Sequence, residues 1–157
     1  MNCPSCGALL RLTENEESFR CEYCGAVYTP PSNEDGVRLL GEASPLACPV
    51  CKIPLEHAAL AGRRILSCTR CQGMLVSMDD FLGLVDELHS RHARSPIVQP
   101  PVNRHDLERH IDCPQCHQRM DTHIYGGPGN IVIDDCDGCS LDWLDKSELM
   151  RVARAPD

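Results

Sequence analysis

Twelve cysteines supply the most reactive side chains of this 157-residue chain, and all of them belong to CxxC pairs. The six pairs form three groups, and the two pairs of a group are separated by 14, 16 or 19 residues. Two CxxC turns at such a distance can bring four thiolates to one tetrahedral zinc ion. The predicted ligands are Cys3, Cys6, Cys21 and Cys24 for the first site, Cys48, Cys51, Cys68 and Cys71 for the second, and Cys113, Cys116, Cys136 and Cys139 for the third.

Four thiolates close the coordination shell of zinc, whereas a catalytic zinc keeps one position open for water. We therefore expect three structural zinc ions and no enzymatic activity. Iron is the alternative metal, because tetrahedral sulfur ligands suit both ions. Redox catalysis by a single CxxC pair is disfavoured, since each CPxC precedes a predicted hairpin and not a helix.

The composition favours small, metal-stabilised modules over one large hydrophobic core. Only 4% of the residues are aromatic, and glycine and proline together account for 23 residues. Modules of about 30–45 residues need a metal or a disulfide to fold. The N-terminus lacks a basic segment followed by an apolar one, and no apolar stretch approaches the roughly 20 residues that span a bilayer. We expect a reducing cytoplasm, where paired CxxC motifs hold metal and not disulfides.

The formal charge is -8 and falls to about -14 when three zinc ions are each held by four thiolates. Nucleic-acid-binding proteins usually carry a basic surface, so a protein partner is the preferred expectation. Of the three parts of the chain that hold the cysteine groups, only the middle part, residues 45–94, contains more basic than acidic side chains. The alternative is therefore a nucleic-acid-binding zinc-ribbon protein that uses a face formed by Arg63, Arg64 and Arg70.

The three groups of cysteines behave as a repeat, and each begins with CPxC. A β-hairpin is predicted between the CxxC pairs of each module, with turns at 13–17, at Ala61-Gly62 and at 125–130. An apolar residue follows four positions after the second cysteine, and a large one four positions after the last. These residues predict a small core beside each metal: Leu10, Leu55, Met120, Tyr28, Leu75 and Trp143.

Helices are predicted after the second and third ribbons. Ser77 and Asp80 begin a helix over 78–94, and Asp145 with Glu148 gives a capping-box signal at the start of another. The first helix carries an apolar stripe that packs either on its own hairpin and a neighbouring module or in a homodimer. The stripe consists of Met78, Phe81, Leu82, Leu84, Val85 and Leu88.

The predicted fold is a small metal-stabilised α+β protein of three tandem zinc ribbons. Ribbon 1 covers 1–31, a linker 32–44, ribbon 2 with its helix 45–94, a Pro-rich linker 95–110, and ribbon 3 with its helix 111–157. If the modules are independent, replacing Cys113 unfolds only the third. An acidic cluster of Asp134, Asp135, Asp137 and Asp142 lacks the spacing of an EF-hand loop, so we expect it to be solvated or to face a partner.

The second and third modules resemble the bacterial transcription factor IIB-type zinc-finger family, whose pattern runs CPxC, a hairpin and then CxxCxGxWLDxxEL. The matching segments are CPVC with CTRCQGMLVSMDDF, and CPQC with CDGCSLDWLDKSEL. The third has Leu141 in place of the pattern's glycine, and the second has Leu75 in place of its tryptophan. The first module resembles a generic zinc ribbon. This resemblance implies a ribbon fold that binds zinc and, by analogy alone, a regulatory or transcription-associated role.

Overall fold

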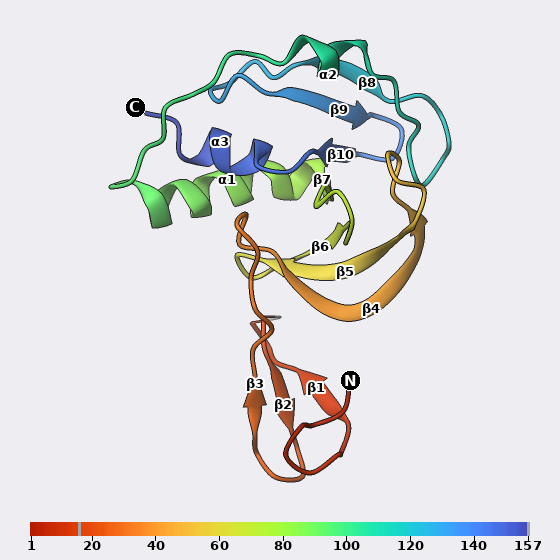
Figure 1. Ribbon diagram of the computed structural model, residues 1–157, viewed down its shortest axis with the longest axis vertical. Helices are drawn as coiled ribbons and strands as arrows, with labels where there is room; N and C mark the ends of the chain where they lie inside the picture. The colour runs from red at the N-terminus through yellow and green to blue at the C-terminus, as the bar shows by residue number, and fades with distance from the viewer. Residues whose placement is uncertain (16, 157) are drawn as a thin grey trace.

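Two β-sheets form the framework of the molecule, a small one near the N-terminus and a larger one built by the rest of the chain (Figure 1). The computed structural model describes residues 1–15 and 17–156. The small sheet is antiparallel and contains β1 (Leu10–Leu12), β2 (Phe19–Cys21) and β3 (Val27–Tyr28). The predicted turn at 13–17 falls between β1 and β2, and its residue 16 lies outside the described residues.

The second and third modules share one antiparallel sheet, in the order β4-β5-β6-β7-β10-β9-β8. Its strands are β4 (Arg38–Ala47), β5 (Pro54–Leu60), β6 (Arg63–Ser67), β7 (Met74–Ser77), β8 (Asp121–Ile124), β9 (Val132–Cys136) and β10 (Leu141–Leu144). Pairing of β7 with β10 joins the two modules. The second and third modules therefore pack on each other: the last strand of each ribbon has an open edge, and the last strand of the other ribbon covers it.

The hairpins form where the sequence predicts them. Ala61 and Gly62 both have positive φ, 49° and 76°, which suits a two-residue turn between twisted antiparallel strands. In the third module, Gly129 and Asn130 have φ of 109° and 51° and precede β9. These local turns fix the register of β5 with β6 and of β8 with β9.

Two helices pack against each other beside the large sheet (Figure 1). The first, α1 (Met78–His92), is capped by Ser77, whose side chain accepts a hydrogen bond from the Asp80 N–H at 3.1 Å. The second, α3 (Glu148–Ala153), follows a turn in which Glu148 Oε2 accepts from the Asp145 N–H at 2.7 Å. The predicted start of α1 is confirmed. For α3 the Glu148 half of the predicted capping box is present, but the helix begins at Glu148 with Ser147 as its N-cap.

The two predicted linkers contain ordered structure. Most of β4 lies within 32–44, and Asp35 Oδ2 accepts a hydrogen bond from the Ser147 N–H at 2.9 Å, just before α3. Within 95–110, α2 (Arg104–Glu108) lies beside β8, and the Ile97 N–H donates to the carbonyl of Arg154. Both segments are therefore packed on the large sheet and its helices instead of acting as spacers.

Three hydrophobic clusters form the core. One lies between the helices and the large sheet and includes Phe81, Leu84 and Leu149. A second contains cysteines of both the second and the third sites together with Trp143. A third unites the small sheet with Leu40 of β4. The first ribbon thus packs against the large sheet through this third cluster, while the second and third ribbons share one core.

Candidate metal centres

Each of the three cysteine groups brings its four sulfur atoms together, within 4.8 Å of one another. Representative Sγ–Sγ distances are 3.7 Å for Cys3 with Cys24, 3.8 Å for Cys48 with Cys71, and 3.6 Å for Cys116 with Cys136. A tetrahedral ion with metal–sulfur bonds of about 2.3 Å separates its ligands by about 3.8 Å. A disulfide would need about 2.0 Å. The residues therefore fit three four-sulfur metal sites, whose geometry suits zinc and iron alike.

Each CxxC pair turns in the same way. The residue directly after the pair has a positive φ at all six positions, namely Gly7, Gly25, Lys52, Gln72, His117 and Ser140. The His117 N–H donates to the carbonyl of Cys113 at 2.9 Å, and the Cys113 N–H donates to the carbonyl of Gln118 at 2.8 Å. Corresponding bonds recur in the four CxxC pairs of the first and second sites. This tight turn places both sulfur atoms of a pair on the same side.

Backbone amides support the thiolate form of some ligands. The Cys24 N–H donates to Cys21 Sγ at 3.5 Å, and the Cys51 N–H donates to Cys48 Sγ at 3.3 Å. The Cys24 amide is the main cause that lowers the pKa of Cys21 to about 6. Burial has the opposite effect at Cys48 and raises the pKa of its thiol. Metals bind thiolates, so an ion at the second site must offset that burial.

The three sites differ in how far solvent reaches them. The first cysteine of every pair is buried. The second cysteine is exposed at both pairs of the first site, Cys6 and Cys24, but only half-buried at the second and third sites. The first site is therefore the most accessible to a chelator.

The predicted core beside the metals is confirmed for five of its six residues. Leu10, Leu55 and Met120 are buried, and so are Leu75 and Trp143. The expectation for Tyr28 is wrong, because this residue is exposed. It stands on β3, a short edge strand of the small sheet, and within residues 1–15 and 17–156 no further strand pairs with the outer edge of β3.

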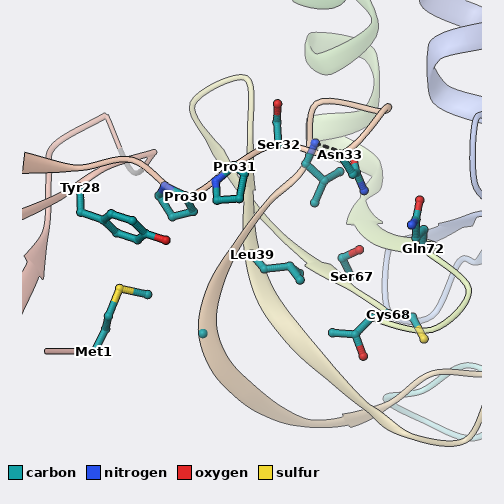
Figure 2. A pocket seen from close by; sticks show the side chains of 13 residues that line it. Met1, Tyr28, Pro30, Pro31, Ser32, Asn33, Leu39, Ser67, Cys68 and Gln72 are labelled. Carbon is teal, nitrogen blue, oxygen red and sulfur yellow. Dashed lines mark hydrogen bonds between the residues drawn. The ribbon is translucent and has the colours of Figure 1, made fainter. Parts of the chain in front are cut away.

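Tyr28 instead lines a cleft of about 380 Å³ between the small sheet and the second module. Figure 2 shows Tyr28 next to Met1 and Pro30 on one side, with Leu39 and the Ser67–Cys68 segment farther along. Of the residues that line this cleft, Met1, Tyr28 and Leu39 are large hydrophobic side chains exposed to solvent. The cleft thus offers an apolar surface next to a ligand of the second site.

A polar network surrounds the tryptophan of the third module. Trp143 Nε1 donates to Asp145 Oδ1 at 3.2 Å, and Arg109 donates to both oxygens of Asp145 at 3.0 and 2.9 Å. Arg109 also donates to Asp134 Oδ2 at 3.0 Å, and Thr122 donates to the other oxygen of Asp134. Sequence reasoning missed Arg109, which lies in the predicted linker, and no local pattern distinguishes it from its neighbours.

Of the three arginines proposed for a nucleic-acid-binding face, Arg63 is held against α1 and does not share a face with Arg64. Arg63 NH1 lies 3.0 Å from Asp80 Oδ1, and its guanidinium packs against Gly83 of α1. Adjacent residues of a strand point to opposite faces, so Arg63 and Arg64 of β6 diverge. Arg64 and Arg70 are exposed.

The apolar stripe of α1 is covered within the same chain. Phe81, Leu84 and Leu88 are buried in the cluster that also contains Leu149 of α3. In the fully described helix, Leu82 is the one large hydrophobic residue that is clearly exposed. The homodimer envisaged through 78–94 therefore lacks the broad apolar face on which the expectation rested.

The predicted acidic cluster divides between the two faces of the sheet. Asp134 is buried and paired with Arg109, whereas Asp135 pairs in register with Asp121 on one side and Asp142 on the other. His123 lies near this row, with Nε2 3.5 Å from Asp135 Oδ2. Burial, followed by the charge of Asp135, raises the pKa of Asp142 to about 6.

No protein-family description, curated protein or solved structure matches the chain. The description of zinc-ribbon-like metal sites therefore rests on the three four-cysteine clusters themselves. Among the described residues, no helix has both the length and the apolar character needed to cross a membrane.

Proposed function

We propose that this chain is a non-enzymatic zinc protein that binds another protein, with three structural ions holding its interaction surface in place. The main support for a non-enzymatic role is that four sulfur atoms come together at each site. Four thiolates satisfy a tetrahedral ion and leave it no position for a substrate or an activated water. The ions would then contribute folding free energy, on the order of 10 kcal/mol each.

The cleft beside the first ribbon is the proposed partner surface. Met1, Tyr28 and Leu39 line it and are exposed, and Tyr23 on the same ribbon is 85% exposed. Aromatic and apolar side chains are enriched at the centres of protein interfaces, and a ring with a polar tip suits a surface that is wet before binding. The favoured partner is a protein segment that inserts apolar side chains between Tyr28 and Leu39.

Membership of the bacterial transcription factor IIB-type zinc-finger family is part of this proposal for the second and third modules. The WLDxxEL tail supports it, because its residues have physical roles in this fold. Trp143 fills the core, Asp145 accepts from its indole, and Glu148 accepts from the Asp145 amide. A regulatory or transcription-associated role and a cytoplasmic location are extensions of the same proposal.

Two measurements test the proposed function. Elemental analysis of the purified chain should find three zinc or iron ions per molecule, and a much lower content would contradict the architecture. Partner capture from the native host, with zinc retained, should then be compared between the wild type and a Tyr28→Ser, Leu39→Ser double variant. A matched control is Val98→Ser, which changes a 94% exposed residue away from the cleft.

The proposal expects a protein partner that the control retains and the double variant loses. Retention of nucleic acid in place of a protein, with loss on Arg70→Glu, would favour the alternative function. Equal capture by the double variant and the wild type would exclude the cleft as the binding surface.

A further inference from the structure

Three carboxyl groups form a cluster that contains none of the cysteine ligands. Asp106 comes from α2, Asp145 from the turn after β10, and Glu148 from the first residue of α3. Each offers an oxygen, and these oxygens lie within 4.8 Å of one another. Residues from three separate segments, one of them in the predicted linker, therefore converge on one small volume.

Glu148 gives an independent reason to expect a ligand there. Its side chain is buried, with 3% exposure, and Oε2 accepts from the Asp145 N–H at 2.7 Å. Its other oxygen, Oε1, is buried without a hydrogen-bond partner among the described residues. A buried carboxyl group with an unpartnered oxygen either keeps a proton or binds a cation.

The surrounding charges also favour a cation. Arg109 pairs with Asp145 and Asp134, and the carboxyl groups of Asp106 and Glu148 lie close to Asp145 as well. Burial, followed by the charge of Asp145, raises the pKa of Glu148 to about 9, so a cation that binds here has to displace the proton of Glu148. Even with Glu148 protonated, the carboxylates of Asp106, Asp134 and Asp145 outnumber the single guanidinium of Arg109.

Asp145 keeps capacity for a further ligand. Its Oδ1 accepts from Trp143 Nε1 and Arg109 NH1, and its Oδ2 accepts from Arg109 NH2. A carboxylate has about four lone-pair positions, so one remains on Oδ2. Asp106 is half-buried and leaves a route from solvent to the cluster.

We infer that Asp106, Asp145 and Glu148 form a fourth metal site, one that takes a hard divalent cation of the calcium class. Carboxylate oxygens suit calcium, magnesium and manganese, whereas thiolates suit zinc, so the site differs in chemistry from the cysteine centres. Calcium is favoured because its oxygen ligands lie at about 2.3–2.6 Å, which allows ligand pairs up to about 5 Å apart. Water would complete the shell on the side of Asp106. Such an ion would fasten α2 and the second linker to the start of α3.

The chain contains its own reporter for this site. Trp143 is the single tryptophan, and its indole N–H donates to Asp145. Terbium(III) binds calcium sites, and an excited indole close to the ion sensitises its emission. The full-length, zinc-loaded protein should therefore be titrated with terbium under excitation of Trp143, and then with calcium as competitor. We expect saturable emission from one ion per chain, displaced by calcium, while the content of three zinc ions stays constant.

Two variants and a control make the assignment specific. Asp106→Asn changes a half-buried residue of a short helix, and Glu148→Gln keeps an oxygen that can accept from the Asp145 amide. Each should weaken terbium and calcium binding by about tenfold or more. Asp121→Asn is the control, because Asp121 belongs to the separate Asp121–His123–Asp135 cluster. It should leave the emission unchanged.

Several results would overturn the inference. One is emission that does not saturate or is not displaced by calcium, which indicates an adventitious ion only. Another is binding that is unaffected by Asp106→Asn in a protein that retains its three zinc ions and its circular dichroism spectrum. A third is loss of binding in the Asp121→Asn control. If Glu148→Gln fails to fold, Asp106→Asn alone decides the question.

Discussion

Leu75 and Trp143 occupy equivalent positions in two ribbons and pair with each other across β7 and β10. Each lies four residues after the last cysteine of its module. Since the strands are antiparallel and pair through equivalent residues, a local pseudo-two-fold axis passes through this pair. The second and third modules are thus arranged like the subunits of a two-fold dimer, although they belong to one chain.

The symmetry of this pair is broken by the size of the tryptophan, and Gly73 accommodates the difference. A Cβ atom at Gly73 would lie 2.3 Å from Cζ2 of Trp143. We expect Gly73→Ala to destabilise the zinc-loaded protein by about 1–3 kcal/mol, because the fully buried ring cannot move away easily. Urea denaturation of the single variants and of the double variant with Trp143→Phe measures the effect.

The smaller phenylalanine ring should remove most of the cost of the alanine, so the two changes should not add. Equal costs of Gly73→Ala in both backgrounds would show that contact with the indole is not the cause.

The shared core couples the second and third metal sites. Cys48 and Cys68 of one site lie in the same hydrophobic cluster as Cys113 and Cys136 of the other. Replacing Cys113 by serine should therefore disturb both modules, and not the third alone as independent ribbons would predict. Amide hydrogen exchange should report lost protection in β5–β7 as well as in β8–β10.

Cys6→Ser is the matched control for this experiment. Cys6 belongs to the first site and is exposed, so protection in the large sheet should persist. Retention of full protection in β5–β7 of the Cys113→Ser variant would instead show that the second module folds without the third.

The first metal should leave before the other two. Its site has two exposed cysteines, Cys6 and Cys24, whereas the outer cysteines of the other sites are half-buried. Competition with a coloured chelator should release one ion per chain in a fast phase and two in a slower one. Replacement of Cys24 by serine should remove the fast phase only. If the Cys24→Ser variant loses the slow phase instead, the ion of the first site is not the one released first.

The sequence predicts what depends on neighbouring residues. CxxC spacing identifies the metal ligands, Ala61-Gly62 identifies a turn, and Ser77 identifies a helix start. Pairings between distant segments leave no such local signal. The contact of Asp35 with Ser147 spans 112 residues and lies in a predicted linker.

Two further features show the same limit. The pairing of β7 with β10 depends on two strand edges that the sequence shows only as separate short apolar segments. Tyr28 has the size and position of a core residue, yet it faces a cleft because β3 is the edge of its sheet. Local spacing therefore predicts the ribbons and their ligands, while the arrangement of the ribbons depends on contacts that only the folded chain displays.

Backbone strain in the turns that follow the CxxC pairs can be relieved by substitution, which should stabilise the protein. His117 has a φ of 64°, where residues other than glycine are disfavoured, while the first module has Gly7 and Gly25 at its equivalent positions. His117→Gly should raise stability by about 0.5–1 kcal/mol, because relief of strain outweighs the greater freedom of the unfolded chain. Thermal unfolding of the zinc-saturated protein measures it. Gln115→Gly, in the same turn but without a positive φ, should lower stability instead.

Asp142 gives a prediction that depends on its charge. Burial and the neighbouring Asp135 raise its pKa to about 6 in the folded protein, above the usual range for aspartate. The folded state therefore holds the proton more tightly than the unfolded state does, and stability falls as pH rises through roughly 4 to 6. At pH 7.5 the ionised carboxylate opposes folding in full.

Asp142→Asn removes this charge and should stabilise the protein by about 1–3 kcal/mol at that pH, measured by urea denaturation with zinc saturating. Asp137→Asn, an exposed neighbour, should gain only a few tenths of a kcal/mol. A loss of stability in Asp142→Asn at pH 7.5 would mean that the carboxylate is held by a favourable partner.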